Sequence, residues 1–66
     1  EPQTVGLWSD GNGNYIHICV TSKEIILIKK TARDAFETTS YRLGQTIKVE
    51  TPDGLTFTLK FEQTNQ

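Results

Sequence analysis

Leu55-Thr56-Phe57-Thr58-Leu59-Lys60-Phe61-Glu62 is a stretch in which apolar and polar residues alternate without a break. Because successive side chains of a β-strand point to opposite faces, this pattern predicts a strand with one buried and one wet face. Residues 45–50 repeat it, with Ile47 and Val49 on the apolar side. Between them, Thr51-Pro52-Asp53-Gly54 has turn chemistry, since proline fixes φ and glycine tolerates a positive φ. The sequence therefore predicts an antiparallel hairpin whose buried face includes Leu55, Phe57, Leu59 and Phe61.

The rest of the chain has the same strand-forming character. Thr, Ile, Val, Phe, Tyr and Trp supply 25 of the 66 residues. Turn-forming residues recur about every ten positions, a spacing typical of antiparallel meanders and small barrels. Further strands are predicted over 4–9, 15–20 and 24–30. The sequence predicts an all-β fold, a small antiparallel meander or SH3-like barrel of five to six short strands, with one domain over 1–62 and a frayed tail over 63–66.

Residues 32–43 fit two structures. Thr31 and Asp34 resemble a helix cap, and an apolar stripe with Gly44 behind it would suit a short helix. Against this, the run of β-branched and hydroxyl residues over 38–41 makes a poor helix interior. The sequence favours a turn followed by a strand over 37–43.

Chain length and residue counts exclude several classes of protein. Cys19 has no second cysteine to pair with, and one Cys and one His cannot complete a four-ligand zinc site. The longest apolar run, 25–28, is far shorter than the roughly 20 residues of a membrane helix. A small domain without disulfide or metal needs a well-packed core or association with a partner. We therefore expect no metal, no cofactor and no membrane contact, while no residue pattern indicates a compartment.

Residues that carry chemistry are few and poorly spaced for catalysis. His17 and Cys19 are two apart on one predicted strand, about 6–7 Å along the chain, whereas a nucleophile and its base need hydrogen-bond contact. Residues 10–14 begin like a calcium loop, but Tyr15 and Thr21 stand where glycine and glutamate belong. A hairpin loop explains them more simply. The sequence predicts that the protein is not an enzyme.

Apolar residues outside the expected core indicate a binding surface. Trp8 alternates out of phase with Val5 and Leu7, so it either faces outward or plugs a closed barrel. The run 25–28 is apolar on both faces, which indicates a central strand or one that a partner covers. The sequence predicts a non-catalytic module that associates with another protein chain or with itself, through a strand edge and an exposed aromatic and apolar face. The predicted interface residues are Trp8, Ile26, Ile28 and Tyr41.

Charge gives an alternative prediction. The net charge of −1 combines +3 over residues 23–48 with −4 over the remainder. A basic middle segment with an aromatic residue nearby can follow a phosphate backbone, so a small β-sheet that binds RNA or other single-stranded nucleic acid is the alternative. The same cations also serve to protect strand edges from pairing. The candidate nucleic-acid-binding residues are Lys29, Lys30, Arg33, Arg42 and Lys48.

Overall fold

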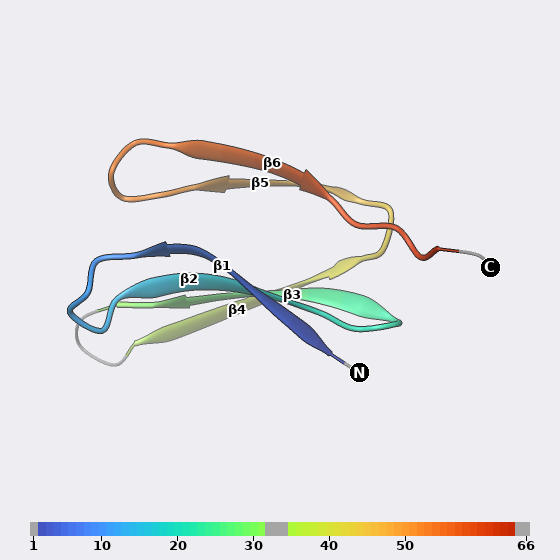
Figure 1. The fold of residues 1–66 in the computed structure, drawn as a ribbon, viewed down its shortest axis with the longest axis horizontal. Coiled ribbons are helices and arrows are strands. Elements are labelled where there is room, and N and C mark those ends of the chain that lie inside the picture. Colours follow the sequence, from blue (N-terminus) through green and yellow to red (C-terminus); the bar gives the residue numbers. More distant parts are fainter. Residues whose placement is uncertain (1, 32–34, 65–66) are drawn as a thin grey trace.

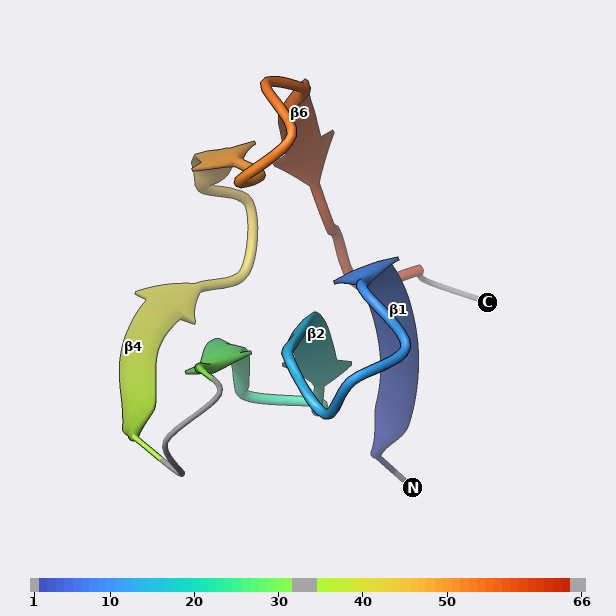
Figure 2. The same cartoon turned by 90° about the vertical axis from the view of Figure 1, so that its left-hand side faces the viewer.

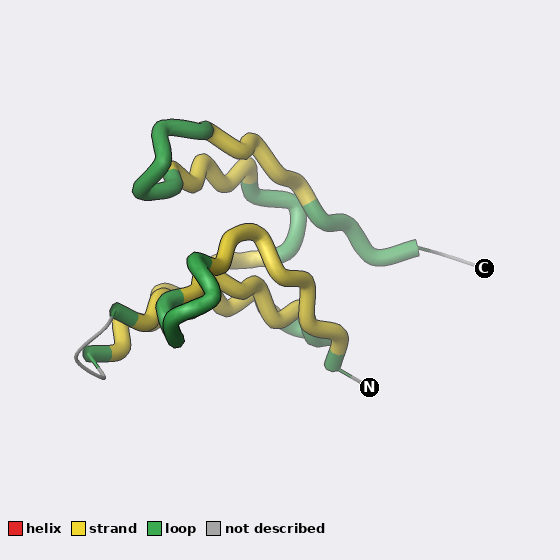
Figure 3. Tube along the Cα trace, turned by 60° about the vertical axis from the view of Figure 1, so that its left-hand side comes forward, coloured by secondary structure: helices red, strands yellow, loops and turns green. Residues whose placement is uncertain are grey.

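Six antiparallel β-strands make up the described part of the chain, residues 2–31 and 35–64 of a computed structural model. They are β1 (Gln3–Ser9), β2 (Tyr15–Val20), β3 (Glu24–Lys30), β4 (Phe36–Arg42), β5 (Thr46–Glu50) and β6 (Thr56–Lys60). Strands and loops alternate along the described chain, without a helix (Figure 3). The all-β antiparallel meander expected from the sequence is confirmed. Within these residues, no helix is long and apolar enough to cross a membrane.

The strands form two sheets. One has the order β1-β2-β3-β4, so each strand pairs with its neighbour in sequence, and the other is the β5-β6 hairpin (Figure 1). Viewed along the strands, the four-stranded sheet is curved, and the hairpin lies across its concave side (Figure 2). Because β3 has a paired strand on each side, the apolar run 25–28 belongs to a central strand.

The second predicted form, an SH3-like barrel, does not close within the described residues, because β4 and β5 belong to separate sheets. The turn that joins them also departs from a regular hairpin. Gly44 adopts a φ of 87°, and the side chain of Gln45 accepts a hydrogen bond from the Arg42 backbone N–H at 3.1 Å. In a regular hairpin, the Arg42 N–H would donate to the main-chain carbonyl of β5. Here it donates to the Gln45 side-chain oxygen instead.

The core lies between the concave face and the hairpin. Ile16, Ile18, Ile25 and Leu27 from the sheet meet Ile47 and Val49 from β5, and all six are buried. Phe57, Leu59 and Phe61 pack against this cluster from the other strand of the hairpin and its C-terminal extension. The side chains that two-residue alternation places on the apolar face of β2, β5 and β6 are therefore the ones that pack in the core.

The predicted hairpin forms, with one correction at its tip. Val49 pairs with Phe57 and Ile47 with Leu59, as the alternation requires. Leu55, however, was expected on the buried face and is 56% exposed. It belongs to the turn and precedes β6, since its backbone N–H is bound by the Thr51 hydroxyl at 3.0 Å. The apolar alternation therefore extends beyond β6 at both ends, by Leu55 before it and by Phe61 and Glu62 after it.

The uncertain segment contains a strand, as the sequence favoured. β4 covers Phe36–Arg42 and pairs with the whole of β3, from Lys30 opposite Phe36 to Glu24 opposite Arg42. All of its residues except Tyr41 are exposed. Threonine and serine suit such a position, because they favour strands without requiring burial.

Candidate functional site

The four predicted interface residues lie on two different faces of the sheet. Tyr41 pairs with the buried Ile25, so it lies on the concave face and packs against the core. Trp8 is opposite the buried Ile16 and also packs against the core. Ile26 and Ile28 lie on the convex face, where each remains half-buried. The structure therefore divides these residues between two faces, with Trp8 and Tyr41 on opposite edge strands, and no single surface contains all four.

A β-bulge turns Trp8 toward the core, which is one of the two orientations that the sequence left open. Strict alternation separates Trp8 from Val5 and Leu7, but the register between β1 and β2 shifts between Gly6 and Trp8. The shift leaves Leu7 as the extra residue, and a bulge turns neighbouring side chains toward the same face. Leu7 and Trp8 accordingly both pack against the core.

The convex face carries a mixed apolar and polar surface. Ile28 lies between His17 of β2 and Thr38 of β4, and Ile26 lies between Cys19 and Ser40. The ring of His17 stacks on Tyr15, with centroids 4.2 Å apart. The imidazole also lies over Gly6, where an added Cβ would stand 3.6 Å from its Cδ2. His17 thus packs on a glycine of the neighbouring strand, and Cys19 is the next residue along the same face.

The basic residues do not form one continuous surface among the described residues. Lys29 shares the concave face with Ile16, while Lys30 and Arg42 lie at opposite ends of the convex face. The Lys30 ammonium donates to the Gly13 carbonyl at 3.1 Å. Lys48 is exposed on the hairpin, on the side away from the core. Arg33 lies outside the described residues. Nucleic-acid binding stays a prediction that this arrangement does not favour.

The outer edge of β4 is a row of main-chain groups that point away from the sheet. Thr31 N–H donates to the Ala35 carbonyl at 3.0 Å, which identifies 31 and 35 as a hydrogen-bonded pair. Hydrogen-bonded and non-hydrogen-bonded residue pairs alternate along an antiparallel ladder. Counting from residue 35, the main-chain N–H and C=O groups of Glu37, Thr39 and Tyr41 therefore bond to β3. The groups of the intervening residues, Phe36, Thr38, Ser40 and Arg42, point outward.

The turn at Gln45 defines the C-terminal end of this edge. The Arg42 N–H is bound by the Gln45 side chain, and its carbonyl accepts from Gln45 N–H at 3.2 Å. Phe36, Thr38 and Ser40 precede that end, in a strand with regular register. Phe36 is 59% exposed, and the Ser40 hydroxyl donates to Glu24 on the neighbouring strand at 2.6 Å. We call Phe36, Thr38 and Ser40 the β4 edge.

The other strand edges are less suited to pairing. β1, at the far side of the same sheet, contains the bulge at Leu7, and bulges interrupt the regular spacing of main-chain groups. β5 and β6 are each five residues long, against seven for β4. Short and bulged strands are the usual ways in which proteins prevent edge pairing. The β4 edge carries neither feature.

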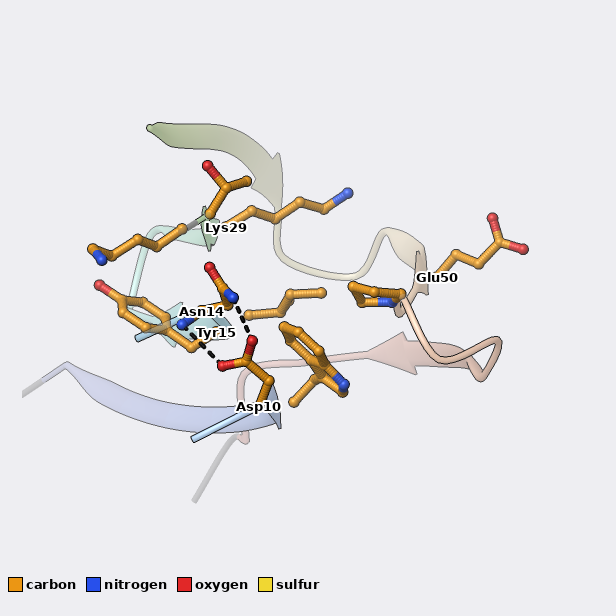
Figure 4. Close-up of a pocket in the computed structure, with 10 residues that line it drawn as sticks. Asp10, Asn14, Tyr15, Lys29 and Glu50 are labelled. Atoms are coloured by element: carbon orange, nitrogen blue, oxygen red, sulfur yellow. Dashed lines mark hydrogen bonds between the residues drawn. The ribbon is translucent and has the colours of Figure 1, made fainter. Parts of the chain in front are cut away.

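A cleft of about 460 Å³ opens where the end of the sheet faces the tip of the hairpin. Trp8, Ile16 and Pro52 line it together with Lys29 and Glu50. Figure 4 shows the Glu50 carboxylate directed away from Asp10 and Asn14. Among the described residues, the Asn14 side-chain oxygen at the cleft has no hydrogen-bond partner. The cleft combines an indole surface with both signs of charge, and it holds no arrangement that indicates one reaction.

The loop between β1 and β2 is organised by Asp10. Its carboxylate accepts hydrogen bonds from the Asn14 side-chain amide and from the backbone N–H groups of Asn12 and Asn14. Gly11 and Gly13 adopt φ values of 79° and 93°, which only glycine takes readily. The expected hairpin loop is therefore present. The hydrogen bond from the Asn14 side chain, followed by that from Asn12 N–H, lowers the pKa of Asp10 below its usual value.

Replacing Asn14 by alanine is expected to raise the pKa of Asp10 toward its ordinary value, because the largest cause of the lowering is removed. A depressed carboxyl pKa contributes stability above the unfolded pKa of about 3.9, and the contribution is lost as pH falls through the folded pKa. An NMR titration of the Asp10 carboxyl carbon measures the shift. Asn12→Ala is the control, since Asn12 contributes its backbone N–H alone. An equal effect of both variants would contradict the assigned cause.

Comparisons with family models, with curated proteins and with solved structures found no match to this chain. The described residues contain no group of three or more His, Cys, Asp or Glu that could hold a metal ion. The β4 edge is thus the candidate site that rests most directly on geometry. Sequence reasoning anticipated a strand edge without locating it. A usable signal was present, namely a run without lysine or proline over 36–41 that contains the strand formers Phe36, Thr38, Thr39 and Tyr41.

Proposed function

We propose that this chain is a non-catalytic binding module that takes up an extended segment of a protein partner along the β4 edge. One observation carries the proposal. β4 is a regular, exposed edge strand whose main-chain groups at Phe36, Thr38 and Ser40 point away from its own sheet. Adding a strand to such an edge is a recurrent mode of peptide recognition.

Main-chain hydrogen bonds provide the attachment, and side chains on alternate positions provide the selectivity. Residues of the incoming strand that face the convex side come beside Thr38 and Ser40, with Ile28 and Ile26 one strand further in. These half-buried isoleucines favour apolar or β-branched partner residues. Residues on the other side come beside Glu37 and Thr39. No side chain reacts in this mechanism, in keeping with a binding protein.

We expect seven-residue peptides selected from a random displayed library to bind and to protect the amides of Phe36, Thr38 and Ser40 from hydrogen exchange. Each of these N–H groups gains an acceptor when a strand is added. Amide exchange followed by NMR, at low micromolar protein concentration, measures the protection. The neighbouring amides of Glu37 and Thr39 are already bonded to β3, so they should change little.

Two variants at one position provide the control. Thr38→Pro removes an outward N–H without removing a ladder bond, and proline is tolerated on strand edges for that reason. Peptide binding should be lost in Thr38→Pro and retained in Thr38→Val, which keeps the backbone donor. Selected peptides that leave the β4 edge amides unprotected would overturn the proposal, as would a selection that yields no binder.

A further inference from the structure

We propose that the strand taken up at the β4 edge is β4 of a second copy of this chain, paired antiparallel about a two-fold axis at Thr38. The inference rests on the proposed function and names the partner. A two-fold pairing requires a surface that complements itself, with each residue i facing j and each j facing i. The β4 edge fulfils this requirement in hydrogen bonding, in side-chain size and in charge.

Hydrogen bonding selects the register. When Thr38 faces Thr38 of the second copy, Phe36 faces Ser40 and Ser40 faces Phe36. All of these residues direct both main-chain groups outward, so each pair exchanges two hydrogen bonds. A register centred on Thr39 would place Phe36 opposite Arg42, whose N–H is already bound by Gln45. The Gln45 side chain therefore favours the register centred on Thr38.

Packing and charge suit the same register. Phe36 is the most exposed large apolar side chain on β4, and it would lie beside the small Ser40 of the second copy, diagonal to Thr38 of that copy. Aromatic rings reach such diagonal neighbours across strands. On the concave side, Glu37 would face the uncharged Thr39, with Lys29 beside it on its own β3. No like charges stand directly opposite each other across the described residues of this pairing.

The contact is small, which sets the expected affinity. Stable complexes bury about 1,200–2,000 Å² in total, and a pairing of short strand edges falls below this range. We therefore expect a reversible dimer that dissociates in the micromolar to millimolar range. The two four-stranded sheets would then form one continuous sheet of eight strands.

Opposite charges at position 38 provide the test. Thr38 is exposed, so Thr38→Lys and Thr38→Glu should leave the fold intact. Across the two-fold axis each variant places like charges face to face, which should weaken self-association on the order of tenfold. An equimolar mixture places lysine opposite glutamate and should restore the dimer. Sedimentation velocity from about 10 μM to about 1 mM covers the expected range.

Thr56→Lys is the matched control, because it makes the same charge change on an exposed position of β6, opposite Glu50, and should dimerise like the unmodified chain. An unmodified chain that stays monomeric throughout the range overturns self-pairing. The same conclusion follows if either charged variant dimerises as tightly as the unmodified chain, or if the mixture associates no more tightly than each variant alone. Peptides that protect the β4 edge of a monomeric chain would leave the proposed function standing while this inference fails.

Discussion

Ile18→Ala is expected to lower the free energy of unfolding by about 2–5 kcal/mol and to leave much of the protein unfolded at 25 °C. Ile18 is fully buried in the cluster between the two sheets, so truncation removes transfer free energy and leaves a cavity. Domains of fewer than about 70–80 residues rarely hold more than about 3–5 kcal/mol in total. Urea denaturation followed by circular dichroism measures the loss.

The same substitution on the convex face is the control. Ile28 is half-buried and lies outside the core cluster, so Ile28→Ala should cost about 1 kcal/mol or less. Both variants are compared at the same low micromolar concentration, so that self-association affects them equally. Equal losses for the two variants would contradict the assignment of concave and convex faces.

Thr51→Val is expected to destabilise the protein by about 1–3 kcal/mol, the second largest effect. Thr51 is 4% exposed, and its hydroxyl accepts the Leu55 N–H at 3.0 Å while donating to the Asp53 carboxylate. Valine has the same shape without the hydroxyl, so the Leu55 N–H loses its partner. Thermal unfolding monitored by circular dichroism measures the change.

Thr51→Ser separates the hydroxyl from the methyl group. Serine keeps the hydrogen bonds and loses one buried methyl, so its cost should be about 0.8 kcal/mol. A serine variant less stable than the valine variant would show that packing, and not the hydroxyl, maintains the turn.

The strands could be predicted from the sequence because short-range rules decide them. The alternation over 55–62 and the turn residues 51–54 specify the hairpin without reference to the rest of the chain. β2 and β3 likewise begin and end where their periodicity does. At Leu55 the pattern extended into the turn, because alternation alone does not show where the hydrogen bonding ends.

The features that depend on pairing could not be predicted. The bulge at Leu7 is a property of the register between β1 and β2, and it turned Trp8 toward the core. The sheets stay separate at the turn where the Gln45 side chain binds Arg42 N–H, a contact that no residue pattern specifies. The interface residues chosen from periodicity were therefore divided between two faces, while the β4 edge emerged from the order of strands in the sheet.

The bulge in β1 also affects how many copies can join. A sheet with two regular edges could add further copies head to tail, which produces an open filament. Among the described residues, β4 gives the four-stranded sheet one regular edge, because Leu7 interrupts the edge at β1. Self-pairing through β4 would occupy that edge in both copies. The joined sheet would then end in a bulged β1 strand on each side. The irregularity in β1 would thus act as a stop to polymerisation, protecting a threonine-rich strand protein from fibre growth.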